Sequence, residues 1–203
     1  KTSQGNENNV LLFSQDSDNI DHWYMDTYVE PQFPAYSNIT KLYEDYGNTN
    51  TDVLNAFNGA DGIKNHIICG FGHGGPTSFN ACVGSLNRTD MDNLSNTDRS
   101  AILFLNHCEN MKWNTNSVAE HYINSLNGGV SVLGYSSFGW TSSPMNFNSP
   151  FIHNIYTDDH HIGIAFKEIK GLYTNSSYKD GILRMDFFSL SLAADPEMPV
   201  WTD

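Results

Sequence analysis

Residues 66–75 read HIICGFGHGG, and residues 101–108 read AILFLNHC. Each segment is a short apolar run that stops at polar residues, with His73 after the first run and Cys108 at the end of the second. Short runs that are apolar on both faces and bounded by turn residues are typical of buried parallel strands. We therefore predict that both segments are strands of one sheet, and that His73 and Cys108 follow them.

Two further apolar runs extend the pattern along the chain. Residues 10–13 read VLLF and precede SQDSD, and residues 129–135 read GVSVLGY and precede SSFGW. Strands that alternate with helical segments indicate an α/β fold, with a mainly parallel sheet covered on both faces. The predicted strands are 10–14, 66–71, 101–107 and 129–135, and the predicted helices are 52–57, 117–126, 154–156 and 162–172.

The length and charge of the chain limit the classes of protein to which it can belong. The 203 residues suit one domain, and we expect residues 1–8 to be a disordered or linker N-terminus and residues 9–203 to be the folded domain. The net charge is −13, so the chain repels phosphate groups and we expect no nucleic acid partner. The longest apolar runs are far shorter than the ~20 residues that span a bilayer. We therefore expect no membrane insertion.

Polar residues that can carry out chemistry follow these predicted strands. Ligands bind at the carboxyl ends of the strands in open parallel sheets, so the loops there are where a site is expected. His73 and Cys108 follow different strands and can meet in space, as nucleophilic thiol catalysis requires. A thiolate is the nucleophile in such a site, and a nearby imidazole helps to generate it or protonates the leaving group.

Other cysteine and histidine residues have simpler interpretations. Cys69 lies inside a predicted strand and is expected to be a small buried hydrophobe. Cys82 lies in residues 76–99, a polar excursion that is expected to be a functional loop or to carry a short helix. His107 neighbours Cys108, but its side chain points to the other face if the strand pleat continues. These three residues are expected to be structural or incidental.

The order of these motifs resembles the gingipain family of cysteine peptidases, within the caspase-like clan. Residues 54–79 read LNAFNGADGIKNHIICGFGHGGPTSF and resemble the region that leads into the family's catalytic histidine. Residues 116–145 read NSVAEHYINSLNGGVSVLGYSSFGWTSSPM and resemble the helix, strand and loop after its cysteine. Residues 192–202 read LAADPEMPVWT and resemble its closing segment, with Ala194 in place of Gly. The resemblance implies a three-layer sandwich with a mainly parallel central sheet.

The resemblance also implies roles for individual residues. Cys108 corresponds to the nucleophile and His73 to the catalytic histidine of a Cys–His dyad that cleaves peptide bonds through a thioester. The backbone N–H groups of Gly74 and Cys108 correspond to the oxyanion hole. Asp16 lies where gingipains carry the glutamate that orients the histidine, and Asp18 is its competitor.

The same resemblance implies the residues around the substrate side chain that precedes the scissile bond. Trp140 corresponds to the aromatic wall of the pocket, and Met145 to a neighbour of that wall. Asp21 corresponds to an acid at the pocket base of arginine-specific members. Phe71 and Asn106 stand two residues before His73 and Cys108 and are expected to narrow the pocket. Both a basic and an uncharged substrate residue stay open, and we favour an uncharged one.

Partners, cofactors and location follow as expectations. We expect a peptide or protein substrate, and a secreted, cell-surface or periplasmic protein. We expect no cofactor and no metal at the site, and a structural calcium ion is kept as the alternative in so acidic a chain. The segment 158–161 reads DDHH and is expected to be a solvated loop rather than a metal site. A gingipain-like fold that has lost peptidase activity and serves as a binding or assembly module is the alternative function.

Overall fold

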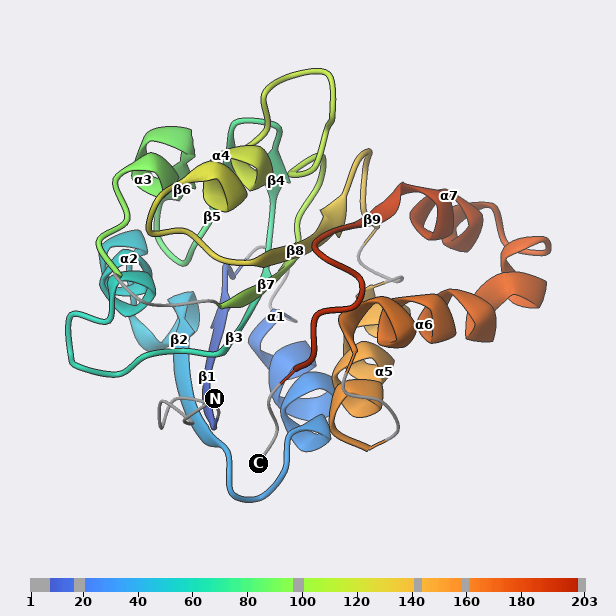
Figure 1. Ribbon diagram of the computed structural model, residues 1–203, viewed down its shortest axis with the longest axis horizontal. Helices are drawn as coiled ribbons and strands as arrows, with labels where there is room; N and C mark the ends of the chain where they lie inside the picture. The colour runs from blue at the N-terminus through green and yellow to red at the C-terminus, as the bar shows by residue number, and fades with distance from the viewer. Residues whose placement is uncertain (1–7, 17–20, 97–100, 141–143, 158–160, 201–203) are drawn as a thin grey trace.

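A computed structural model describes residues 8–16, 21–96, 101–140, 144–157 and 161–200, with the side chains of residues 21 and 144–146 outside the description. A six-stranded sheet forms its centre, as Figure 1 shows. All neighbouring strands are parallel except the last pair. In spatial order the strands are β2 (Asn38–Tyr43), β1 (Asn9–Ser14), β3 (Ile67–Phe71), β7 (Ile102–Asn106), β8 (Ser131–Tyr135) and the antiparallel β9 (Leu190–Ala193).

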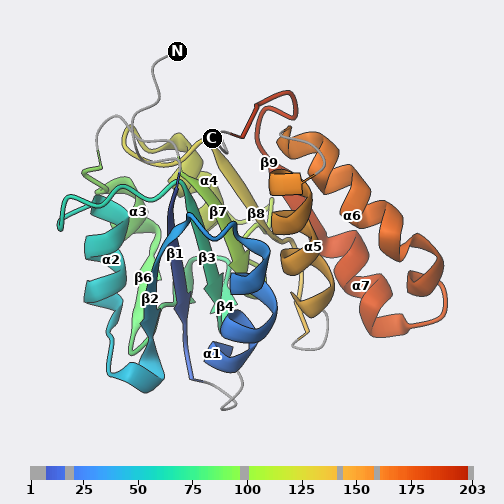
Figure 2. The ribbon, with the colours of Figure 1, turned by 90° about the horizontal axis from the view of Figure 1, so that it is seen from below.

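Helices cover both faces of this sheet, as Figure 2 shows in side view. One layer consists of α2 (Asn50–Asn58), α3 (Arg88–Asp92) and α4 (Val118–Asn124). The opposite layer consists of α1 (Asp21–Tyr24), η1 (Met25–Val29), η2 (Glu30–Gln32), α5 (Pro144–Thr157), α6 (Ile162–Ser177) and α7 (Gly181–Ser189). The α/β fold with a mainly parallel central sheet is confirmed.

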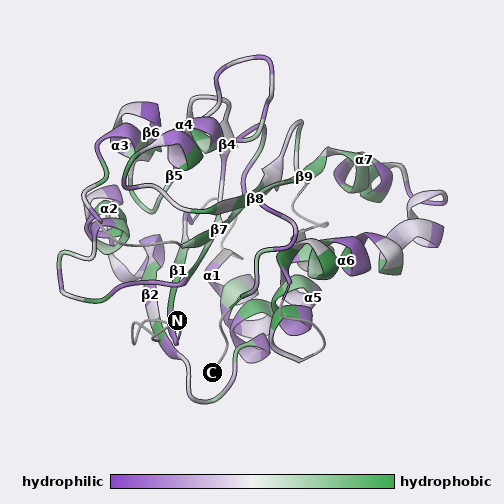
Figure 3. Ribbon diagram, in the orientation of Figure 1, coloured by the Kyte–Doolittle hydropathy of each residue, from purple (hydrophilic) through white to green (hydrophobic). Residues whose placement is uncertain are grey.

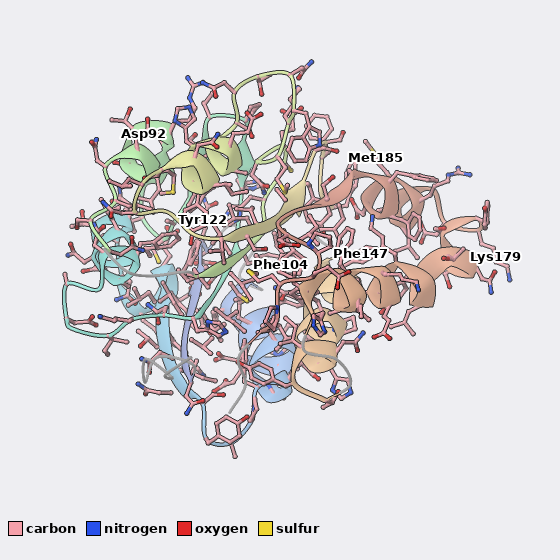
Figure 4. All side chains as sticks on the ribbon, viewed as in Figure 1. Asp92, Phe104, Tyr122, Phe147, Lys179 and Met185 are labelled. Carbon is pink, nitrogen blue, oxygen red and sulfur yellow. The ribbon has the colours of Figure 1, made fainter. Side chains whose placement is uncertain are left out.

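The alternation of side chains along the strands produces two hydrophobic cores. On β7, Ile102 and Phe104 face the α5–α6 layer, while Leu103 and Leu105 face the α2–α4 layer. Figure 3 shows the resulting apolar colour along the central strands. In Figure 4, Phe104 and Phe147 lie on the α5 side and Tyr122 on the α4 side. Because both faces of β7 are buried, its sequence is a continuous apolar run rather than an alternating one.

All four strands predicted from the apolar runs form, within about two residues of the expected ends. The two edge strands β2 and β9 and the helix α7 were not predicted. The sequence of β2, NITKLY, mixes polar and apolar residues, because an edge strand is only partly covered. The helix expected at residues 154–156 is the end of the longer α5, which continues through Pro150, a residue that usually ends a helix.

The polar excursion after β3 folds into a second, small sheet and a short helix. The strands β4 (Gly74–Gly75), β5 (Ser78–Asn80) and β6 (Ser85–Asn87) pair in an antiparallel manner, and α3 follows directly. The expected short helix is therefore confirmed, while the sheet was not predicted. Residues 1–7 and 158–160 lie outside the described part, so the expectations for the N-terminus and for the DDHH segment stay predictions. In the described part, no helix is both long and apolar enough to cross a bilayer.

Candidate active site

The register of the sheet brings the ends of β3 and β7 to the same level. Phe71 pairs with Asn106 in the last parallel pair, so His73 and Cys108 each lie two residues beyond it. The two chains stay together past the strand ends, because the Gly72 N–H donates to the Asn106 carbonyl at 3.3 Å. His73 and Cys108 therefore leave adjacent strands at the same carboxyl edge of the sheet.

Gly74 allows the loop after His73 to pass close to the cysteine. A Cβ atom at Gly74 would lie 2.8 Å from the Cβ of His107 and 3.4 Å from the carbonyl oxygen of Cys108. The first distance is shorter than side chains tolerate, so this approach of backbone to backbone depends on glycine. The residue next to His73 is thus packed directly against the residues 107 and 108.

A tight turn presents Cys108. Glu109, the next residue, has a left-handed φ of 53°, and the Asn110 side-chain amide donates to the carbonyls of Leu105 and His107. The Cys108 thiol donates to the Gly139 carbonyl at 3.4 Å, and its side chain is half-buried. These contacts fix the sulfur between the end of β7 and the loop that follows β8.

The imidazole of His73 is left available while its backbone is held firmly. The His73 N–H donates to the Gln15 side-chain oxygen at 3.0 Å, and the Asn80 N–H donates to the His73 carbonyl at 2.9 Å. Within the described residues, the imidazole itself makes no hydrogen bond, and the residue is exposed. Such a ring can exchange protons with a bound substrate.

The geometry of the small sheet leaves a backbone donor beside the cysteine. The bond between Asn80 and His73 makes these two residues a hydrogen-bonded antiparallel pair, so the next pair, Gly74 with Phe79, is a non-hydrogen-bonded one. The Gly74 N–H therefore points away from β5. The Cys108 N–H likewise has no acceptor among the residues that the structure describes. Two uncommitted N–H groups are the donors that an oxyanion requires.

The role of Asp16 in orienting His73 stays a prediction. Its backbone N–H donates to the Glu44 carboxylate at 3.1 Å. The residue before it, Gln15, contacts the backbone of His73. Asp18 lies outside the described residues.

The predicted pocket residues differ in their surroundings. Phe71 is buried and packs against the ring of Tyr24, with 5.0 Å between ring centroids. Asn106 is 4% exposed, and neither of its amide atoms has a hydrogen-bond partner in the described structure. Trp140 is 47% exposed, and its backbone N–H donates to the buried carboxylate of Asp186 on α7. The side chains of Asp21 and Met145 lie outside the described residues.

The residues with simpler interpretations lie in the interior. Cys69 is buried in the core beside α5, and burial raises the pKa of its thiol. Cys82 lies in the core on the opposite face, where burial raises its pKa to about 12. His107 points to the α2–α4 side and packs against the rings of Phe13 and Phe79. Its burial lowers the pKa of the imidazole to about 3, so the ring is neutral.

Gln15 and Asn80 are contacts of His73 that were not predicted from the sequence. Both are uncharged amides in polar stretches, SQDSD and SFNA, where nothing in the sequence distinguishes them from other turn residues. Gln15 is the first residue after the predicted strand 10–14, and this strand lies beside the strand that precedes His73. That position is the signal that could have identified Gln15 as a site residue. Asn80 could not be identified, because β5 was not predicted.

Comparisons with known proteins bear on the family and the fold of the chain. Residues 1–201 match the model of peptidase family C25. The Arg-specific cysteine proteinase gingipain R has a similar fold, with a TM-score of 0.75 and 20% identity over 97% of this chain and 48% of that one. A complex of Porphyromonas gingivalis RgpB pro- and mature domains gives 0.73 and 21% over 97% of this chain and 49% of that one. Caspase-1 from Spodoptera frugiperda gives 0.57 and 7% over 92% of this chain and 88% of that one.

The chain spans about half the length of the gingipain structures that it resembles. None of the curated protein sequences compared with it matches. The likeness to gingipain R and caspase-1 concerns the fold, since the identities are low. The family model, in contrast, covers nearly the whole sequence, and the chain therefore belongs to peptidase family C25.

Proposed function

We propose that this chain is a cysteine endopeptidase that uses Cys108 as nucleophile and His73 as general acid and base. The observation that carries the proposal is the register of β3 and β7, from which both residues emerge at one level of the sheet edge. Family membership supports the same reaction class. The exposed imidazole and the half-buried thiol are both accessible to a peptide or protein substrate.

The reaction proceeds in two steps. His73 takes the proton of the Cys108 thiol, and the sulfur attacks the scissile carbonyl carbon. The N–H groups of Gly74 and Cys108 stabilise the negative charge that forms on the carbonyl oxygen. His73 gives a proton to the leaving amine as the C–N bond breaks, which leaves a thioester on Cys108. Water then attacks the thioester carbon and gives a proton to His73, and the Cys108 thiolate leaves. Asp16 stays a candidate for orienting His73.

A probe that alkylates the nucleophile tests this proposal. A peptidyl acyloxymethyl ketone is expected to label the wild-type protein at Cys108 faster than it labels a free thiol in solution. Cys108→Ala abolishes labelling and peptide hydrolysis, and His73→Ala lowers both. Cys69→Ala is the matched control, because it removes a buried thiol remote from the substrate and leaves labelling unchanged. Labelling no faster than that of a free thiol would favour the binding or assembly module instead.

A row of side chains beside Cys108 supports an uncharged substrate residue before the scissile bond. Phe71 pairs with Asn106. Phe104 pairs with Leu133, so two residues further along both strands Asn106 lies beside Tyr135, on the same face of the sheet. The Asn106 amide and the Tyr135 hydroxyl are buried and have no hydrogen-bond partner in the described residues. Unpaired buried polar groups are costly, and an uncharged substrate side chain with a donor and an acceptor would pair them.

A positional-scanning peptide library tests this preference. We expect amide-bearing residues to be favoured before the scissile bond, and Asn106→Ala to reduce that preference by about 10-fold while Cys108 still reacts with iodoacetamide. A library in which arginine or lysine exceeds every uncharged residue would show instead that an acid, such as Asp21 or the buried Asp186, determines specificity.

A further inference from the structure

All four polar groups of Asn80 make hydrogen bonds, and its backbone connects the two halves of the proposed dyad. Its N–H donates to the His73 carbonyl at 2.9 Å, and its carbonyl lies 3.0 Å from the His107 ring nitrogen Nε2. Its side-chain N–H donates to Gln15 Oε1 at 2.9 Å, and its side-chain oxygen accepts from the Ser85 hydroxyl at 2.7 Å. One residue of β5 is thus bonded to His73 and to the neighbour of Cys108.

Gln15 closes the arrangement from the end of β1. Its N–H donates to the Phe71 carbonyl at 3.0 Å, which continues the ladder between β1 and β3 by one residue. Its side-chain oxygen accepts from both the His73 N–H and the Asn80 side chain. Both peptide groups that flank the Cα of His73 are therefore held, one by Gln15 and the other by Asn80.

His107 anchors the cysteine side. Since a carbonyl only accepts hydrogen bonds, the contact with Asn80 requires that Nε2 of His107 carries the proton. The ring packs against Phe13 and Phe79, with 6.0 and 5.3 Å between centroids, and these contacts restrict its movement. Because His107 and Cys108 share a peptide bond, the position of this ring fixes the backbone from which the sulfur projects.

We propose that Gln15, Asn80 and His107 form a positioning frame that sets the separation of the His73 imidazole and the Cys108 sulfur; this rests on the endopeptidase function proposed above. The frame acts on the backbones and makes no hydrogen bond to either reactive side chain. A misplacement of about 1 Å in such a site lowers the rate by about 100-fold, so the frame affects catalysis more than substrate binding.

Substitutions at Gln15 test the frame. Gln15→Met has nearly the same shape but no acceptor, and we expect it to lower kcat for a peptide substrate by about 10- to 100-fold with little change in KM. Gln15→Glu restores acceptor oxygens at the same reach and is expected to recover most of the rate. Gln15→Asn keeps the amide but shortens the side chain by one methylene, so the amide no longer reaches His73. This variant replaces Gln15→Met in the test if Gln15→Met does not fold. Gln32→Met is the matched control. It makes the same substitution at a glutamine whose side chain donates an exposed hydrogen bond to the Tyr28 carbonyl.

The rate of Cys108 alkylation by iodoacetamide, measured between about pH 6 and pH 9, separates the two proposals. If His73→Ala flattens this pH profile and Gln15→Met flattens it in part while Gln15→Glu restores it, the frame is supported. If His73→Ala has its effect but Gln15→Met behaves as wild type in both profile and kcat, the frame is wrong and the dyad stands. If His73→Ala leaves the profile unchanged, the dyad is wrong and the frame falls with it.

Discussion

Cys69, Cys82 and Cys108 lie in three different surroundings, which separate their reactivities. Cys69 is enclosed within β3, and burial raises the pKa of its thiol. Burial also raises the pKa of Cys82 to about 12, and its thiol donates to the Leu42 carbonyl at 3.1 Å. Since the thiolate is the reactive form, these two cysteines are protonated and shielded near neutral pH. Cys108, in contrast, is only half-buried, so reagents in solution can reach its sulfur.

Iodoacetamide at near-neutral pH is therefore expected to modify Cys108 alone in the native protein. Mass spectrometry of peptides from the labelled protein gives the site. Unfolding in urea before labelling should expose all three thiols equally and provides the control. Modification of Cys82 at a rate comparable to that of Cys108 would contradict the buried position of Cys82.

His107 makes the protein sensitive to acid. Its pKa is about 3 in the folded state, below the ordinary value of 6.5, because burial disfavours the charged ring. The folded state therefore binds fewer protons than the unfolded state between these two pH values. The stability that this group contributes is fully present above about pH 6.5 and is lost as the pH falls toward about 3.

We expect this residue alone to lower the free energy of unfolding by about 1.4 kcal/mol for each pH unit below about 6. His107→Gln does not titrate and should remove this slope, although it also changes the packing against Phe13 and Phe79. The measurement is urea unfolding of both proteins from about pH 7 to about pH 4. Equal slopes for the two proteins would show that His107 is not buried in its neutral form.

At the scale of elements, Lys170 joins α6 to the end of α7. Its ammonium donates to the carbonyls of Phe187 and Leu190, and it lies over the rings of Phe166 and Phe187. Burial lowers its pKa to about 8 from 10.5. Since α7 also carries Asp186, which accepts from the Trp140 backbone, this contact helps to fix one side of the candidate site.

The lowered pKa of Lys170 predicts a rise in stability with pH. Above about pH 8 the folded state releases the proton, while the unfolded state keeps it up to about pH 10.5, so the unfolded state binds more protons. The free energy of unfolding should therefore increase through this window relative to Lys170→Met, in which the group is absent. Thermal unfolding of both proteins at matched pH values measures the difference. A constant difference across the window would mean that Lys170 is solvated.

The strands that the sequence predicted are those that are buried on both faces. β1, β3, β7 and β8 are covered on both faces, so each is a continuous apolar run that is visible without any knowledge of its neighbours. β2 and β9 lie at the edges, and their mixed polar and apolar sequences become strands because a neighbouring strand offers hydrogen bonds. The same holds for β5, whose three residues owe their form to pairing with β4 and β6.

At the scale of the whole molecule, the net charge of −13 sets a field around the site. A negative field raises the local concentration of cationic ligands and is screened by salt. We expect a peptide substrate with lysines away from the scissile bond to have a higher kcat/KM than its glutamate counterpart. Increasing the ionic strength from about 0.01 M to about 0.15 M should shrink the difference, because the Debye length falls from about 30 to about 8 Å. A difference that salt does not change would have to come from direct contacts.

The sequence by itself determined the α/β class, the four central strands, and the placement of His73 and Cys108 just after two of them. These features depend on local patterns, namely apolar runs and the turn residues that end them, together with the resemblance to a known family. The tertiary structure alone decided that β3 and β7 are neighbours in register, that Gly74 passes against Cys108, and that Gln15 and Asn80 hold His73. Hydrogen bonds between residues far apart in the chain leave no periodic signal, since an amide in a polar turn looks the same whether or not a partner reaches it.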